Sequence, residues 1–158
     1  MTARLQVVCF GISPGPSLDD SGHGPFAFQT VDTLEALAAS DADALLVQLP
    51  QLAELLAWPA LEAAALRTAT VVVAADPDPA LVQRLVQAGV QDVLPAADAQ
   101  GARLALALSV AVARKRLDIA TRRAYATDLS TGLPNHPQLL EHMSHLLALR
   151  EREPAPMA

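Results

Sequence analysis

The cysteine and the histidines, which could act as a nucleophile or hold a metal ion, are scattered along this sequence. The single cysteine, Cys9, lies inside an apolar run, and one cysteine cannot form a disulfide within a chain. We expect Cys9 to be a small buried hydrophobe rather than a reactive thiol. The histidines show no zinc-ligand spacing with Cys9, and we expect them on the surface: His23, His136, His142 and His145.

Two pairs of acidic residues are the other candidates for chemistry. Asp19 and Asp20 could form a metal-binding pair, but they lie in a segment rich in glycine and proline, where acids commonly form turns. Asp76 and Asp78 precede an expected helix, so we interpret them as capping acids. The sequence therefore predicts no catalytic, cofactor-binding or metal-binding residue in this chain.

The composition indicates a folded domain of ordinary size with an appendage. Of the 158 residues, 52% are hydrophobic and 18% are charged, which is enough apolar material for a core. Aromatic residues make up only 3%, so alanine, valine and leucine must build that core. The net charge of -6 argues against binding to nucleic acid, and we interpret the one basic run, residues 114–116 with 122–123, as a solvated helix face.

Neither a signal peptide nor a membrane span is predicted. The apolar run that follows the N-terminus is too short for a signal peptide. The longest later run, residues 104–113, is far below the ~20 residues that cross a bilayer. We therefore expect a cytoplasmic protein with no membrane partner.

Apolar runs alternate with helical segments along most of the chain. The runs predict strands at residues 5–12, 27–31, 44–49, 70–75 and 90–94. Helices are predicted at residues 34–39, at 51–66 with a break at Pro59, at 80–88 ending at Gly89, and from residue 102 onward. This alternation predicts an α/β fold, a flavodoxin-like (CheY-like) doubly wound sheet of five parallel strands in the order 2-1-3-4-5.

The segment between the first two strands should lack its usual helix. Residues 13–26 contain six glycines and prolines, which disfavour a helix by ~1 and ~3 kcal/mol each. We expect the first helix to be absent or reduced to one turn, and a partner subunit or a displaced helix to cover the sheet face left open.

Two fragments carry a resemblance to the receiver domains of two-component response regulators. The run from Asp43 to Gln48 is similar to the family's D-x-x-x-x-D third strand, and the run from Ala88 to Leu94 is similar to its A-G-A-x-D-Y-L fifth strand. The resemblance covers roughly residues 4–117. The alternative is another α/β fold that never carried the family's site.

The resemblance implies a phosphorylation site whose key residues have all been replaced. The family uses an acceptor aspartate on the third strand, two acids that hold Mg²⁺ after the first, a Ser or Thr after the fourth, and a Lys after the fifth. Gln48 stands at the acceptor position, and an amide cannot form an acyl phosphate. The other changed positions, which include that of an aromatic switch residue, are Phe10, Gly11, Ala74, Val93 and Ala96. We expect no phosphorylation; the alternative is an atypical receiver that is still phosphorylated.

The long helix at 102–126 carries two apolar stripes. Leu104, Leu108 and Ala111 or Val112 should pack on the sheet. The second stripe follows the 4-3-4-3-4 spacing of a coiled coil, which predicts a homodimer. We call this stripe the seam; its residues are Leu106, Val110, Ala113, Leu117, Ala120 and Ala124. The alternative is a lone amphipathic helix with small alanines.

Residues 127–135 are similar to the D-x-L-T-G-L-x-N-R segment that opens GGDEF (diguanylate cyclase) domains. The matching residues are Asp128, Thr131, Gly132, Leu133 and Asn135. His136 departs from the usual arginine, which puts that contact in doubt. A helix at 138–150 should follow. The resemblance implies that the family's catalytic residues, and its use of GTP and Mg²⁺, lie beyond this chain.

Together these features predict three regions: a degenerate receiver core at 1–101, a signalling helix at 102–126, and the start of a GGDEF domain at 127–158. We expect a regulatory and dimerisation module that controls cyclic di-GMP synthesis, with an upstream signalling protein as a possible partner. A scaffold whose cyclase part is itself inactive is a further alternative.

Overall fold

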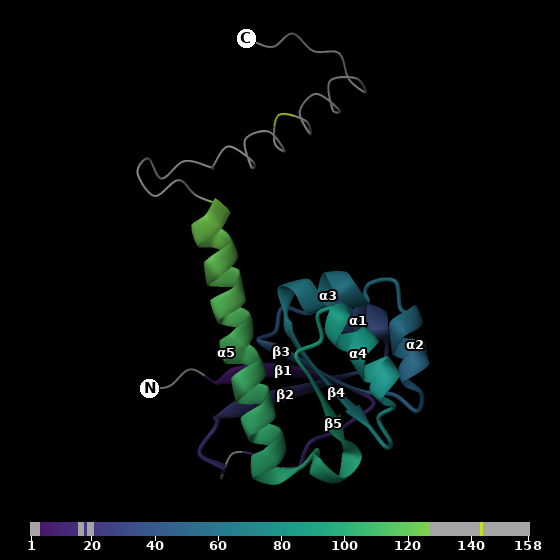
Figure 1. The fold of residues 1–158 in the computed structure, drawn as a ribbon. Coiled ribbons are helices and arrows are strands. Elements are labelled where there is room, and N and C mark those ends of the chain that lie inside the picture. Colours follow the sequence, from purple (N-terminus) through teal and green to yellow (C-terminus); the bar gives the residue numbers. More distant parts are fainter. Residues whose placement is uncertain (1–3, 16–17, 19–20, 127–142, 144–158) are drawn as a thin grey trace. The chain divides into compact units, whose positions relative to one another are not determined.

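A computed structural model describes residues 4–15, 18, 21–126 and 143 (Figure 1). Its strands are β1 (Leu5–Phe10), β2 (Phe26–Val31), β3 (Ala44–Gln48), β4 (Ala69–Ala74) and β5 (Asp92–Pro95). They form one parallel sheet in the order β2-β1-β3-β4-β5. The predicted doubly wound, CheY-like fold is therefore confirmed.

The short helices begin and end where local residue chemistry predicts. Helix α1 (Leu34–Ala39) begins at Thr33, whose hydroxyl accepts a hydrogen bond from the Ala36 amide at 3.1 Å. The helical stretch that follows β3 is divided at Pro59 into α2 (Leu52–Ala57) and α3 (Leu61–Arg67), as expected.

The later helices also agree with the predictions. Helix α4 (Pro79–Gln87) is capped by Asp78, whose carboxylate accepts from the Ala80 amide at 2.8 Å, and Gly89 follows it with φ of +99°. A short 3₁₀ turn (Ala96–Asp98) leads into the long helix α5 (Gly101–Ala126). None of the helices in the described part of the chain is long and apolar enough to cross a membrane.

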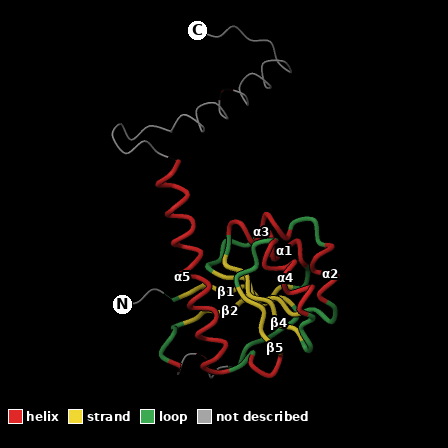
Figure 2. The backbone as a smooth tube through the Cα atoms, viewed as in Figure 1, coloured by secondary structure: helices red, strands yellow, loops and turns green. Residues whose placement is uncertain are grey.

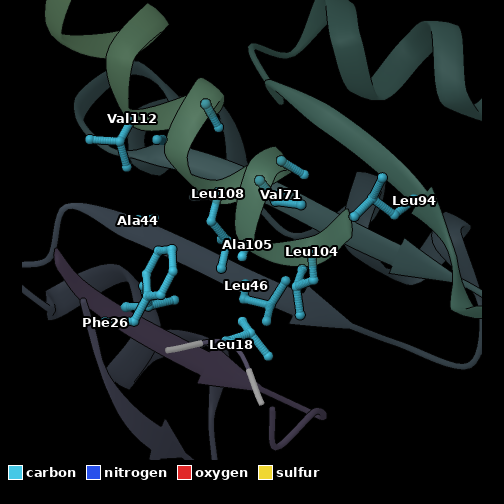
Figure 3. Close-up of a cluster of buried hydrophobic side chains, with 14 of the residues drawn as sticks. Leu18, Phe26, Ala44, Leu46, Val71, Leu94, Leu104, Ala105, Leu108 and Val112 are labelled. Atoms are coloured by element: carbon cyan, nitrogen blue, oxygen red, sulfur yellow. The ribbon is translucent and has the colours of Figure 1, made fainter. Parts of the chain in front are cut away.

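The sheet separates two hydrophobic cores. Helices α1 to α4 lie on one face and α5 lies on the other (Figure 2). The α5 side is built from strand residues such as Ala44, Leu46 and Val71, together with Leu104 and Leu108 of the helix (Figure 3). This arrangement buries the first predicted stripe of α5, which is therefore confirmed.

No α-helix occurs between β1 and β2 among the residues described there, 11–15, 18 and 21–25, in agreement with the sequence. The cover that we expected from a partner subunit or a displaced helix stays a prediction, although this segment itself covers part of the sheet face. Leu18 of this same segment is only 1% exposed and belongs to the core that contains Leu46 and Phe26 (Figure 3). Leu18 and Ser21 have 3₁₀ conformation, so a short turn places this leucine into the core where prolines and glycines disfavour a longer helix.

The chain divides after Arg116 into two units, Met1–Arg116 and Leu117–Ala158, and α5 contributes residues to both. The sheet and both cores belong to the first unit.

Candidate functional site

The carboxyl edge of the sheet is the place where an open α/β sheet usually binds its ligands. Phe10, Gln48 and Ala74 are the last residues of β1, β3 and β4, and the register of these strands brings them to the same edge. Gly11 and Ala96 directly follow β1 and β5, while Val93 lies within β5. The structure thus brings the positions that the receiver resemblance singled out to one edge of the sheet. Val93 lies two residues before the end of β5.

The backbone of Gly11 lies close to the backbone of Gln48 at this edge. Its φ is +72°, a conformation that other residues rarely adopt. A Cβ added to Gly11 would overlap the carbonyl oxygen of Gln48 and lie 3.1 Å from its carbonyl carbon. An aspartate therefore cannot stand at position 11 unless the backbone moves. The sequence showed a missing acid, but this steric reason was visible only in the structure.

The side chains at the edge do not form a receiver-type Mg²⁺ site. Phe10 and Gly11 offer no side-chain oxygen, and Gln48 offers a neutral amide where the family has a carboxylate. Across residues 4–15, 18, 21–126 and 143, no three histidine, cysteine or acidic side chains gather as metal ligands would. Asp19 and Asp20 lie outside the described residues, so the alternative of a displaced pair stays a prediction.

An open hollow of about 430 Å³ lies at the carboxyl ends of β1 and β2. It is lined by Phe10, Gly11, Ile12, Ser13, Thr30, Val31 and Asp32. Asp32 is the only acid in this lining, with two hydroxyl groups and several apolar side chains around it. Such a lining can form hydrogen bonds, but it has neither the paired acids nor the lysine of a phosphoryl-transfer site.

Cys9 is confirmed as a buried hydrophobe. The residue is the penultimate one of β1 and is inaccessible to solvent, and burial raises the pKa of its thiol to about 12. Because the thiolate is the reactive form, Cys9 is chemically inert at neutral pH.

The basic run at residues 114–116 differs from the solvated helix face that we expected. Lys115 is only 5% exposed, and its Nζ donates a hydrogen bond to the Ala65 carbonyl oxygen at 2.7 Å. Arg116 pairs with Asp43, with 2.8 Å between Nη2 and Oδ1. The prediction was wrong for Lys115, while Arg114 and Arg116 are exposed as expected. Lys115 continues the buried stripe of Leu108 and Val112, and that spacing was the signal we missed.

The seam residues of α5 are all exposed. The exposed fractions of the three largest are 38% for Leu106, 36% for Val110 and 69% for Leu117. The three seam alanines, Ala113, Ala120 and Ala124, are exposed as well. An apolar helical stripe that faces solvent is a candidate interface, because its burial against a partner would be favourable.

The GGDEF-like motif cannot be placed. Asp128, Thr131, Gly132, Leu133 and Asn135 lie outside the described residues, as do three of the four histidines. Within the expected helix at 138–150, only Met143 is described, and it is helical and 51% exposed.

Comparison with known proteins supports the fold. No protein-family model and no curated protein matches the chain. Among solved structures, a signal receiver domain from Vibrio parahaemolyticus is similar, with a TM-score of 0.53 and 17% identity over 75% of this chain and 98% of that one. The signal receiver domain of an HD domain-containing protein from Pseudomonas fluorescens Pf-5 gives 0.52 and 18%, over 76% and 95%.

A pilus assembly-related protein from Burkholderia pseudomallei is similar to the same degree, with a TM-score of 0.51 and 20% identity over 70% of this chain and 91% of that one. At such low identities the likeness establishes the fold and leaves the partner and activity open. This chain has the fold of a response-regulator receiver domain.

Proposed function

We propose that this chain is a regulatory and dimerisation module of a cytoplasmic signalling protein, with a receiver fold that does not accept a phosphoryl group. The carboxyl edge of the sheet carries this proposal. Gln48 ends β3 without a carboxylate, and the Gly11 backbone lies against Gln48 where the family needs an acid. An amide without a metal site beside it has no route to an acyl phosphate.

The helix α5 supplies the second part of the proposal, which is a homodimer. The exposed seam has the a/d spacing of a coiled coil, and it runs along a helix of 26 residues. We propose that the seams of two copies pair, and that this pairing sets the relative orientation of the segments that follow α5 in the two copies.

The third part is the output. We propose that the segment at 127–135 opens a GGDEF domain, and that the module controls condensation of two GTP into cyclic di-GMP with Mg²⁺. Support comes from the sequence motif alone. The resemblance implies an active site shared by two such domains, so a dimer would be required for activity. The input would come from an upstream signalling protein rather than from nucleic acid or a membrane.

The phosphorylation claim is tested by intact-mass measurement. The chain is incubated with acetyl phosphate and Mg²⁺, with an ordinary receiver domain as the positive control. We expect the mass of this chain to stay unchanged, also for Gln48→Asp, because Phe10, Gly11 and Ala96 leave the new carboxylate without metal ligands or lysine. A stoichiometric phosphoryl adduct on the wild-type chain would overturn the proposal.

The dimer is tested by sedimentation at tens of micromolar. We expect a dimer for the wild type and a monomer for Leu117→Glu, since the charge would be buried in the seam. Leu66→Glu is the matched control, because Leu66 is also an exposed helical leucine, at 50%, and lies on α3. A monomeric wild type, or equal weakening by both substitutions, would contradict this part.

The output is tested with the full-length natural protein (the parent), by measuring cyclic di-GMP formed from GTP and Mg²⁺. We expect product from the wild type and Leu66→Glu, and little from Leu117→Glu. A parent that makes no cyclic di-GMP would contradict the cyclase assignment and favour a scaffold, while leaving the fold and the dimer untouched.

A further inference from the structure

The stripe of α5 that packs on the sheet ends in a buried cation. Going along this stripe, Leu108, Ala111 and Val112 are nearly inaccessible, and the next position toward the C-terminus is Lys115. Lysine is rarely buried unless its ammonium group is bound. Its presence at the last core position of α5 therefore requires a specific role.

Lys115 binds a carbonyl on the opposite face of the sheet. Its Nζ donates to the Ala65 oxygen at 2.7 Å, and Ala65 lies in the last turn of α3. The last four carbonyls of a helix have no partner within the helix, so the ammonium group satisfies one that α3 itself cannot. A methionine could fill the same volume, but it would leave this buried oxygen without a donor. Since α3 and α5 pack in different cores on opposite faces of the sheet, Lys115 links two helices that the sheet separates.

Arg116, the next residue, is bound at the same amino edge of the sheet. Its guanidinium donates to Asp43 Oδ1 at 2.8 Å, while Asp43 Oδ2 accepts from the Gln6 amide at 2.9 Å. Asp43 directly precedes β3, and its own amide donates to the Gln6 carbonyl at 2.9 Å. The Arg116 side chain is 64% exposed and that of Asp43 is 29% exposed, so this pair is weaker than the buried contact of Lys115.

We propose that Lys115 and Arg116 form a latch. It holds the last packed turn of α5, residues 112–116, to α3 and to the amino ends of β1 and β3. Through the latch, a change in α3 on one face of the sheet alters the anchoring of the signalling helix on the other face. The latch lies within one subunit and within the first unit of the chain, so it operates whether or not the seam dimerises.

Hydrogen exchange of backbone amides under native conditions tests the latch on the whole 158-residue chain. We expect Lys115→Met to speed exchange at residues 112–116 by about tenfold, from the loss of a hydrogen bond to a charged group. We also expect faster exchange in the last turn of α3, at residues 65–68, because the same substitution removes the hydrogen bond that holds this turn to α5. Residues 104–108 of α5 should change by less than about twofold.

Arg114→Gln is the matched control. Arg114 is exposed, lies in the same turn, and its loss removes the same charge at similar helix propensity. We expect Arg114→Gln to leave exchange unchanged, and Arg116→Gln to speed it about threefold at residues 112–116 only, as for an exposed ion pair.

Two outcomes would overturn the latch. One is equal acceleration by Arg114→Gln and Lys115→Met, and the other is uniform acceleration along the chain in Lys115→Met, which would mean a loss of global stability alone. If Lys115→Met does not fold, Arg116→Gln decides, because the partly exposed Arg116 can be replaced without opening the core. No local change at residues 112–116 in Arg116→Gln would then refute the latch.

Discussion

The two edges of the sheet differ in the chemistry that they present. At the carboxyl edge, where a receiver would bind Mg²⁺ and a phosphoryl group, the strands end in Phe10, Gln48 and Ala74. At the amino edge, charged side chains join elements: Asp43 joins β1 to α5, and Lys115 joins α5 to α3. This distribution is what we expect of a domain that acts through its last helix rather than through a phosphorylated residue.

The largest effect is expected at the carboxyl edge, for Gly11→Asp. A side chain at this position meets the Gln48 carbonyl and a positive φ, so we expect a loss of about 2 to 4 kcal/mol in the free energy of unfolding. Urea denaturation measures this loss. Gly15→Asp is the control, because a Cβ added at Gly15 would meet no atom within 4 Å, and its change in unfolding free energy should stay within about 0.5 kcal/mol.

Equal stability of Gly11→Asp and Gly15→Asp would contradict the steric conflict that we infer at the carboxyl edge. It would show that the carboxyl edge accepts the family's acid easily, and that the missing acids have no steric cause.

The next largest effect is expected at the amino edge, for Asp43→Ala. The substitution removes the partner of Arg116 and leaves the Gln6 amide without its carboxylate acceptor, which should cost about 1 to 3 kcal/mol of unfolding free energy. Asp41→Ala, at an exposed position two residues earlier, is the control and should be nearly neutral. Thermal unfolding of both variants measures the difference. Equal unfolding midpoints would mean that the contacts of Asp43 stabilise the fold no more than an exposed surface charge does.

A smaller effect is expected for Asp78→Ala, which lies beyond the carboxyl end of β4. Asp78 caps α4 through the Ala80 amide, and loss of an N-cap costs about 1 kcal/mol. Asp76→Ala is the matched control, since Asp76 is exposed and precedes the cap. If Asp76→Ala destabilises the fold more than Asp78→Ala in urea, the acids on this side have a role other than capping.

The smallest effect at neutral pH is expected for Cys9, which lies at neither edge. The pKa of its thiol is raised from 9.0 to about 12, so the folded state favours the protonated form. The resulting stabilisation is complete below pH 9 and is lost as the pH rises toward 12. A thiol reagent at pH 8 should modify Cys9 only after unfolding in urea, and rapid modification of the folded chain would contradict the burial of this strand.

Much of the fold was predictable because local signals agreed with the tertiary structure. Apolar runs marked all five strands, Pro59 marked the break between α2 and α3, and Gly89 marked the end of α4. The missing first helix was also predictable, since prolines and glycines act on the backbone locally. The burial of Leu18 was not predictable, because one buried leucine in a single 3₁₀ turn shows no periodicity in the sequence.

By itself, the sequence determined the strand order through the receiver-like pattern, the two stripes of α5 through their spacing, and the absence of a carboxylate at Gln48 through residue identity. Only the tertiary structure decided that Gly11 lies against Gln48 and that Lys115 crosses to Ala65, 50 residues earlier in the chain. Composition and periodicity describe a residue's own element. A contact between elements depends on how closely the sheet brings them together. The distance between two elements is set by packing rather than by local conformational preference.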